Sequence, residues 1–193
     1  MRKFFLLGVP VDDMEEKITR KSIISIGGVK YIDSFECDTR TKSTECIIGR
    51  KHIGDENGKT IYKYGSLVLI GEDANYYRLH LGDLQISNSL KECNSYFQCP
   101  SDCVIVGRHF SNGETYYSYR KVIISKTKSL KMETCSISVN KESDGSLIEK
   151  ILSVNDNQEK YYLPMVGRVH NSNATIETTT LFATKFYVDD DLE

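Results

Sequence analysis

The sequence predicts an all-β fold with pseudo-threefold symmetry, and three observations lead to that prediction. First, a Gly-Arg pair, a polar turn and a Thr-led strand recur, beginning at Gly49, Gly107 and Gly167. Internal periods of about 60 residues point to a repeat architecture. Second, β-branched and aromatic segments alternate with Gly, Asn and Asp along most of the chain. Third, helical periodicity is confined to two short stretches, residues 11–20 and 147–152.

The elements expected in order are strands separated by polar turns. Each strand is rich in Val, Ile, Tyr or Thr, which suit a pleated sheet, and is bounded by Gly, Asn or Asp, which tolerate tight turns. In residues 60–64 and 115–119 the Thr and both Tyr share one face, because side chains alternate along a strand. The expected strands are residues 1–11, 23–26, 29–32, 45–48, 60–70, 76–81, 102–106, 115–125, 130–139, 161–166 and 175–187.

The repeats are expected to form one domain that covers the whole chain, residues 1–193. They span approximately residues 30–86, 87–146 and 147–188. Roughly four strands in each repeat give about twelve strands, which suits a barrel or a prism of threefold symmetry. A trefoil-like and a prism-like arrangement both meet that count, and the pattern does not choose between them.

The bulk composition excludes several classes of partner. The formal net charge is −2, so no global positive charge attracts nucleic acid. The mean hydropathy is −0.38, and no apolar run approaches the roughly 20 residues of a spanning helix, so membrane insertion is not expected. The N-terminal apolar run continues into Asp12 and Asp13 without a small-residue cleavage site. We therefore expect no standard signal peptide, and either a cytoplasmic location or export by a signal-independent route.

Six cysteines, an even number with partly repeated spacing, suggest disulfides. Cys37 and Cys93 each follow a glutamate, and Cys46 and Cys103 each lie shortly before a Gly-Arg pair. A bridge from Cys37 to Cys46, and one from Cys93 to Cys99 or Cys103, are the pairings predicted for an oxidising compartment. Reduced, partly buried thiols are the alternative.

The repeated turn and its flanks combine the side chains that a neutral sugar requires. Sugar hydroxyls need carboxylate and amide acceptors and Arg or Asn donors, and a sugar ring can rest on an aromatic side chain. Aligning Thr60, Thr115 and Thr175 puts Glu177 where the other copies have Tyr, so the third site is expected to be altered. The predicted ligand-binding residues are Arg50, His52, Asp55, Glu56, Asn57 and Tyr62, then Arg108, His109, Asn112, Glu114 and Tyr117, then Arg168, His170 and Asn173.

Two metal sites are weaker alternatives. The oxygen-bearing side chains of Asp55 and Glu56 surround a turn, as a calcium site requires, although the other copies lack this pair. Cysteines 93, 99 and 103 with His109 could hold zinc, but no C-x-x-C pair is present. No resident cofactor is expected otherwise.

The sequence therefore predicts a non-catalytic, lectin-like protein that binds glycans or glycoconjugates, with oligomerisation left open. No hydrolase, metalloprotease or phosphate-loop motif is present. Triplication suits multivalent binding of a repetitive ligand better than a single asymmetric active site. The alternative is a structural or protein-binding module of a toxin, phage particle or surface assembly. Exposure of Arg50, Asn57 and Tyr62 around a shallow depression would favour sugar binding, whereas packing of the same residues in the interior would favour a scaffold.

Overall fold

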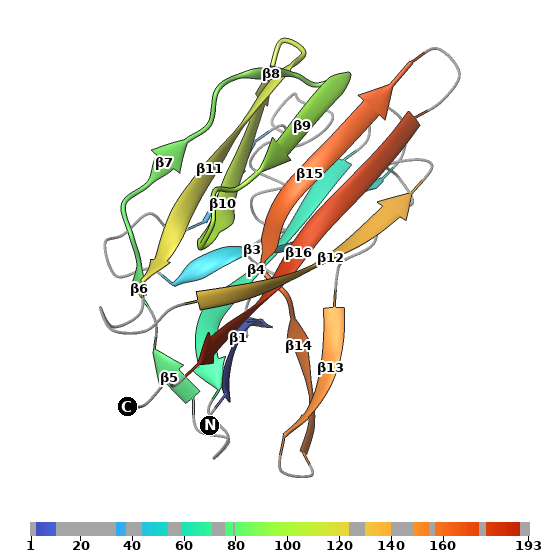
Figure 1. The fold of residues 1–193 in the computed structure, drawn as a ribbon. Helices are drawn as coiled ribbons and strands as arrows, with labels where there is room; N and C mark the ends of the chain where they lie inside the picture. Colours follow the sequence, from blue (N-terminus) through green and yellow to red (C-terminus); the bar gives the residue numbers. More distant parts are fainter. Residues whose placement is uncertain are drawn as a thin grey trace.

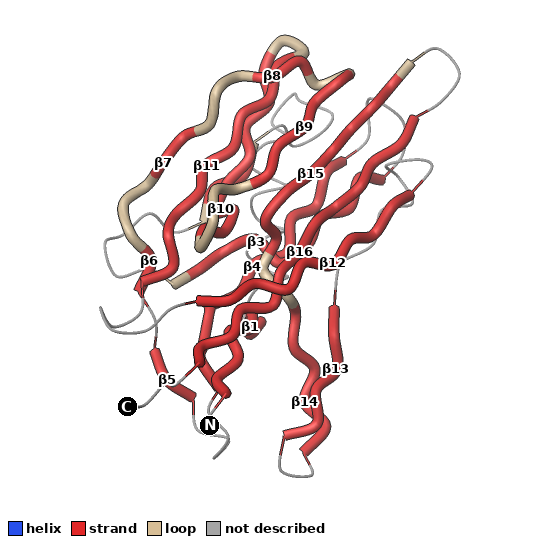
Figure 2. The backbone as a smooth tube through the Cα atoms, in the orientation of Figure 1, coloured by secondary structure: helices blue, strands red, loops and turns tan. Residues whose placement is uncertain are grey.

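The computed structural model describes residues 3–10, 34–37, 44–53, 59–70, 76–78, 80–123, 130–139, 149–154, 157–173 and 177–189. Within these ranges the protein is all-β, as predicted, and contains no helix (Figure 2). It follows that these ranges hold no helix of the length and apolarity that a membrane crossing needs. Of the two helical stretches considered from sequence, residues 11–20 lie outside the described ranges. The second prediction is wrong, because residues 149–152 belong to a strand.

The described strands form open antiparallel sheets rather than a closed barrel (Figure 1). One sheet has the order β13-β14-β1-β16-β15-β9. In this sheet β12 also pairs with β16, β4 pairs with β1, and β3 and β5 each pair with β4. The other has the order β2-β10-β11-β6, with β7 and β8 also on β11. The strands are β1 (Lys3–Pro10), β2 (Phe35–Glu36), β3 (Glu45–Ile53), β4 (Lys59–Ile70), β5 (Tyr76–Arg78), β6 (His80–Leu81), β7 (Gln85–Ile86), β8 (Leu90–Lys91), β9 (Asn94–Gln98), β10 (Cys103–Ser111), β11 (Glu114–Ile123), β12 (Leu130–Val139), β13 (Glu149–Val154), β14 (Asn157–Tyr162), β15 (Met165–Ser172) and β16 (Glu177–Asp189).

Three hairpins carry the Gly-Arg motif, and they are built alike. In each, the Gly-Arg strand pairs with the strand that follows the turn: β3 with β4, β10 with β11, and β15 with β16. Each pair has one register shift immediately before the glycine, as a β-bulge produces. The shifts lie between Ile47 and Gly49, Ile105 and Gly107, and Met165 and Gly167.

The register corrects the sequence alignment of the third copy. Arg50 lies opposite Tyr62 and Arg108 opposite Tyr117, whereas Arg168 lies opposite Leu181. Thr179, not Thr175, therefore occupies the place of Thr60 and Thr115, and Glu177 lies at the hairpin end opposite Ser172. The sequence alignment failed because it assumed equal turn lengths in the second and third copies.

Two short strands tie one hairpin to the next. Strand β2 pairs with β10, and Cys37 N donates to the Val106 carbonyl at 2.8 Å. Strand β9 pairs with β15 in the same way, and Cys99 N donates to the Val166 carbonyl at 2.8 Å. The segment ending in Cys37 therefore corresponds to the one ending in Cys99, not to the Glu-Cys pair at Cys93.

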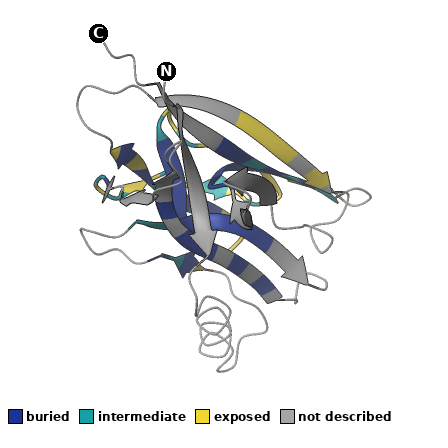
Figure 3. Ribbon diagram, turned by 90° about the horizontal axis from the view of Figure 1, so that it is seen from below, coloured by how far each residue is buried: buried dark blue, intermediate teal, exposed yellow. Residues whose placement is uncertain are grey.

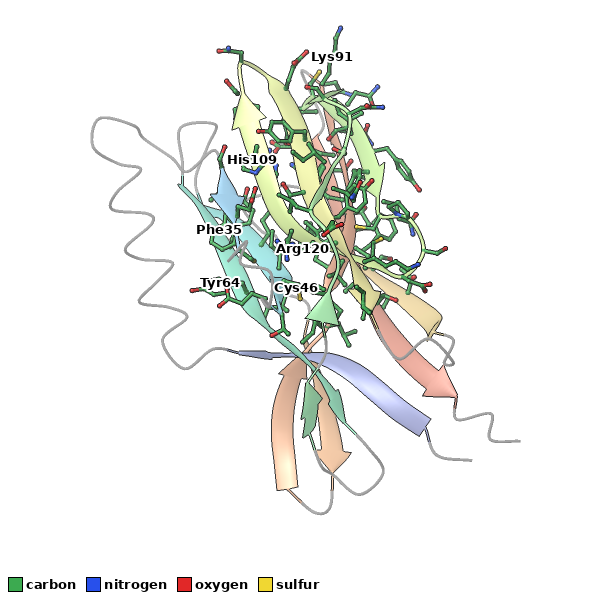
Figure 4. All side chains as sticks on the ribbon, turned by 90° about the vertical axis from the view of Figure 1, so that its left-hand side faces the viewer. Phe35, Cys46, Tyr64, Lys91, His109 and Arg120 are labelled. Atoms are coloured by element: carbon green, nitrogen blue, oxygen red, sulfur yellow. The ribbon has the colours of Figure 1, made fainter. Side chains whose placement is uncertain are left out.

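The two tying strands, β2 and β9, each pack a phenylalanine against a different hairpin from the one they pair with. Phe35 of β2 contacts the β3–β4 hairpin, and Phe97 of β9 contacts the β10–β11 hairpin. Phe35 stacks on Tyr62 with ring centroids 5.2 Å apart and also contacts Tyr64 (Figure 4). Phe97 stacks on Tyr117 at 4.5 Å. These stacked pairs join buried aliphatic residues of the Gly-Arg strands in one hydrophobic core. Buried residues run along strands such as β10 and β15, whereas part of β12 is exposed (Figure 3).

Candidate functional site

The three arginines of the repeated motif point into the interior. Their exposed fractions are 3% for Arg50, 4% for Arg108 and 0% for Arg168. Glu92, from the turn between β8 and β9, lies among them: its Oε1 is 2.6 Å from Arg168 Nη2 and its Oε2 is 2.9 Å from Arg108 Nη2. We call these three arginines and Glu92 the arginine cluster. Its ion pairs join the second and third hairpins, because Glu92 pairs with Arg108 and Arg168.

Two tyrosines adjoin the arginine cluster, and each hydrogen-bonds to the arginine of the next hairpin. Arg108 Nη1 donates to Tyr62 Oη at 3.0 Å, and Arg168 Nη1 donates to Tyr117 Oη at 3.3 Å. Arg50 also hydrogen-bonds to Tyr62 and lies over its ring, 5.9 Å from the centroid. The motif residues therefore bind one another across hairpins.

Burial and mutual charge shift the pKa values in the cluster. Burial disfavours the charged form of Glu92, yet the guanidinium groups of Arg168 and Arg108 outweigh it and hold the pKa of Glu92 well below its usual range. Burial, together with repulsion from Arg168 and Arg108, lowers the pKa of Arg50 to about 9. The cluster therefore balances strong attraction at Glu92 against repulsion among its arginines.

The predicted histidines occupy two different environments. Nε2 of His109 lies 2.7 Å from Glu36 Oε2, and its ring stacks on Tyr116. Nδ1 of His170 lies 2.7 Å from Thr179 Oγ1 in the interior. Burial and the positive charge of Arg168 lower the pKa of His170 to about 4, so it is neutral near pH 7. His52 belongs to β3, but its side chain lies outside the described part.

Among the predicted site residues whose side chains the structure describes, only those at the hairpin ends are exposed. Asn112 and Gly113 have φ values of 51° and 76° and form the tight turn predicted from their sequence. Glu114 accepts a hydrogen bond from Ser89 at 3.0 Å. Asn173 is exposed at the end of the third hairpin. Asp55, Glu56 and Asn57 lie outside the described residues, and the calcium prediction lies there with them.

The cysteines form neither the predicted bridges nor the zinc site. All six lie in the described ranges and are thiols, so Cys37 and Cys46, for example, are not joined. Burial raises the pKa of Cys46 and of Cys99, which makes their thiolates inaccessible near neutral pH. Among the described residues no three His, Cys, Asp or Glu side chains are placed to hold a metal ion.

The sequence reasoning missed an exposed sheet surface that the tertiary structure assembles. Strands β9, β15, β16 and β12 lie side by side, in that order (Figure 1). Residues directly opposite one another in such a sheet share a face. We call this shared side the outer sheet face; it comprises Asn94, Tyr96 and Gln98 on β9, Val169 and Asn171 on β15, Thr178, Thr180 and Phe182 on β16, and Ser136 and Ser138 on β12. Its residues on β9 and β12 and Asn171 are exposed, whereas Val169 and the three residues of β16 are half-buried.

The outer sheet face is uncharged and rich in hydrogen-bonding groups. Tyr96 is 62% exposed, and its hydroxyl donates to Gln98 Oε1 at 3.0 Å. Ser138 and Thr180 hydroxyls are 2.8 Å apart across the β12–β16 pair. The one local signal in the sequence is the alternation within β9, where Asn94, Tyr96 and Gln98 are exposed between buried residues. No family model, curated protein or solved structure matches this chain.

Proposed function

We propose that this protein is a non-catalytic carbohydrate-binding protein and that the outer sheet face is its binding surface. The exposed combination of Tyr96, Asn94 and Asn171 carries the proposal. Tyr96 offers a ring face on which a sugar ring can rest, and the neighbouring amides offer both donors and acceptors. The Asn94–Asn171 pair lies two residues along the strands from the Tyr96–Val169 pair, on the same face. The aromatic and amide groups are therefore neighbours.

The chemistry of the face favours a neutral glycan. None of its defining residues is charged, so a neutral ligand displaces water without leaving a charge unsolvated. Four neighbouring strands span about 14 Å, given the usual interstrand spacing. Hydroxyl groups of Thr178, Thr180 and Ser138 extend this surface away from Tyr96. A sheet surface of this width suits several sugar units of an extended chain.

We further propose that the scaffold beneath this face is pseudo-threefold and prism-like. The strands β3, β10 and β15 each contact the other two. The Arg108–Tyr62 and Arg168–Tyr117 bonds repeat one relation between successive hairpins. The repeated bulge and the repeated Phe–Tyr stack support the same arrangement. On this proposal the Gly-Arg motif builds the scaffold and the ligand binds elsewhere.

The second candidate is a structural or protein-binding module, and the burial of the motif favours it. Arg50 and Tyr62 are packed inside, which was the outcome expected of a scaffold. Exposed polar groups at the hairpin ends, including Asn112, Glu114 and Asn173, would then contact a protein partner.

A binding experiment on glycan arrays and on soluble neutral polysaccharides tests the first candidate. Tyr96→Ala and Asn171→Ala should each weaken binding roughly tenfold, the loss expected for one stacking or amide contact. Ile86→Ala is the matched control, because Ile86 is 61% exposed but lies on β7 in the other sheet. A parallel series with chelator tests the calcium prediction at Asp55 and Glu56.

Three outcomes contradict the proposal in different ways. No binding by folded, multivalently displayed protein rejects carbohydrate binding and leaves the protein-binding module. Binding that survives Tyr96→Ala and Asn171→Ala, but is lost in Asn112→Ala or Asn173→Ala, moves the site to the hairpin ends. Binding that Ile86→Ala weakens equally shows that the variants act through stability.

A further inference from the structure

Tyr62 has an unusual hydrogen-bonding position. Its side chain is buried, with an exposed fraction of 1%, and its ring is stacked on Phe35. Its hydroxyl oxygen accepts from Arg108 Nη1 at 3.0 Å and also hydrogen-bonds to Arg50. Two guanidinium groups from two different hairpins therefore meet at one phenolic oxygen.

A neutral phenol is poorly matched to two guanidinium donors. Guanidinium groups only donate hydrogen bonds, so the tyrosine proton cannot be directed at either of them. A phenolate accepts from both donors without a proton between them, and bonds to a charged acceptor are about twice as strong as neutral ones. Burial opposes ionisation, but Arg108 and Arg50 are close enough to overcome that cost.

We propose that Tyr62 ionises ahead of the protein's other tyrosines and that its phenolate ties the β3–β4 hairpin to the β10–β11 hairpin. The proton is released to solvent, and the phenolate becomes a second negative group in the arginine cluster beside Glu92. The link is a pH-sensitive device, because it strengthens when Tyr62 loses its proton and weakens when the proton returns.

The groups that face Tyr62 come from several elements. Arg50 on β3 and Arg108 on β10 bond to its oxygen, while Arg168 on β15 adds positive charge to the cluster. Glu92 is the negative group of the cluster, and it pairs with Arg108 and Arg168. Phe35 on β2 packs on the ring and carries no charge. Positive charge predominates among these groups.

The electrostatics agree with the geometry. Burial raises the pKa of Tyr62, but the charges of Arg108 and Arg50 and their hydrogen bonds outweigh burial and lower it below 10.0. A pKa lowered by folding adds stability that is fully present above the unfolded value, and that stability is lost as pH falls through the folded value. Stability should therefore rise with pH between the two values.

Tyr117 supplies a matched control within the same chain. It occupies the equivalent place on the second hairpin and is stacked on Phe97 in the same way. Its hydroxyl accepts from Arg168 Nη1 at 3.3 Å, a longer bond than that to Tyr62. The third hairpin has Leu181 at this place and so has no hydroxyl there.

The test is a pH titration of the protein labelled with ¹³C at the tyrosine ζ carbons, whose NMR shift reports phenolate. One of the 12 tyrosine signals should change at lower pH than the rest, be retained in Tyr117→Phe and be lost in Tyr62→Phe. Titration of all tyrosines together in the wild type overturns the proposal, as does loss of the early signal in Tyr117→Phe alone. If Tyr62→Phe does not fold, joint titration of all tyrosines in the wild type, or loss of the early signal in Tyr117→Phe, still overturns the proposal.

Discussion

Glu92 is the residue on which the interior charge balance depends. It is a carboxylate that pairs with two buried arginines at once, and it enters the cluster from a turn. Its backbone N–H donates to the Gly113 carbonyl at 2.9 Å, which fixes that turn against the second hairpin. Removing one partner of a buried ion pair is far more costly than removing both, because the remaining charge stays unsolvated.

We therefore predict that Glu92→Gln lowers the free energy of unfolding by about 3–5 kcal/mol at pH 7. Glu114→Gln is the control, because that carboxylate is exposed, and it should change stability by less than about 0.5 kcal/mol. Urea unfolding followed by circular dichroism measures both. Equal small effects would show that the cluster does not depend on Glu92.

The pH dependence of that contribution has a definite sign. The pKa of Glu92 is lowered by folding, so its stabilisation is present above the ordinary carboxyl pKa and is lost as pH falls through the folded value. Wild-type stability should fall in acid, and the Glu92→Gln variant should lose less on acidification.

At the scale of the elements, the tying strands β2 and β9 require glycine on the strands they meet. A Cβ at Gly167 would lie 2.8 Å from the Phe97 carbonyl oxygen, and one at Gly107 would lie 3.1 Å from the Phe35 carbonyl oxygen. Both contacts are with backbone, which cannot rotate away as a side chain can. The glycines of the second and third copies are thus explained by the close approach of a neighbouring strand.

Gly167→Ala should consequently destabilise the protein by about 1–3 kcal/mol, the range typical of overpacking. Gly82→Ala is the matched control, because its Cβ would meet the movable Ile123 side chain at 3.3 Å. Thermal unfolding of the two variants gives the comparison. If Gly82→Ala were the more harmful change, close strand approach would not be the reason for Gly167.

At the scale of the whole molecule, the arginine cluster connects three hairpins that are distant in sequence. Arg108 bonds to the first hairpin through Tyr62, and Arg168 bonds to the second through Tyr117. Glu92 holds Arg108 and Arg168 together. Loss of one hairpin would leave buried charges without their partners, so the hairpins should not unfold separately.

We predict a single cooperative unfolding transition for the hairpins. Tyrosine fluorescence, which is usable because the chain has no Trp, and circular dichroism should give coincident curves in urea. Arg168→Met should shift both curves together by about 3 kcal/mol or more, as breaking a buried pair does. Separate transitions would mean that the third hairpin is an independent unit.

The all-β class and most of the described strand positions could be predicted from the sequence. These features follow from local causes: β-branched and aromatic alternation, turn residues such as Asn112 and Gly113, and a repeated Gly-Arg pair. The same local evidence misplaced the third Thr, because turn length is not encoded in the spacing of short motifs. It also predicted disulfides between cysteines that are close in sequence, such as Cys37 and Cys46, but the fold does not join them.

Which polar residues are buried depends on the tertiary structure. Arg50 and Tyr62 have the composition of a sugar site, and composition does not reveal the face of a strand that packs inward. That choice depends on residues from elsewhere in the chain: Phe35 of β2 stacks on Tyr62, and Glu92, from the turn between β8 and β9, pairs with Arg108. The outer sheet face likewise joins Tyr96 to Asn171 and Thr180 through long-range pairing. Register between distant strands arises from packing of the whole chain, so no local pattern could predict it.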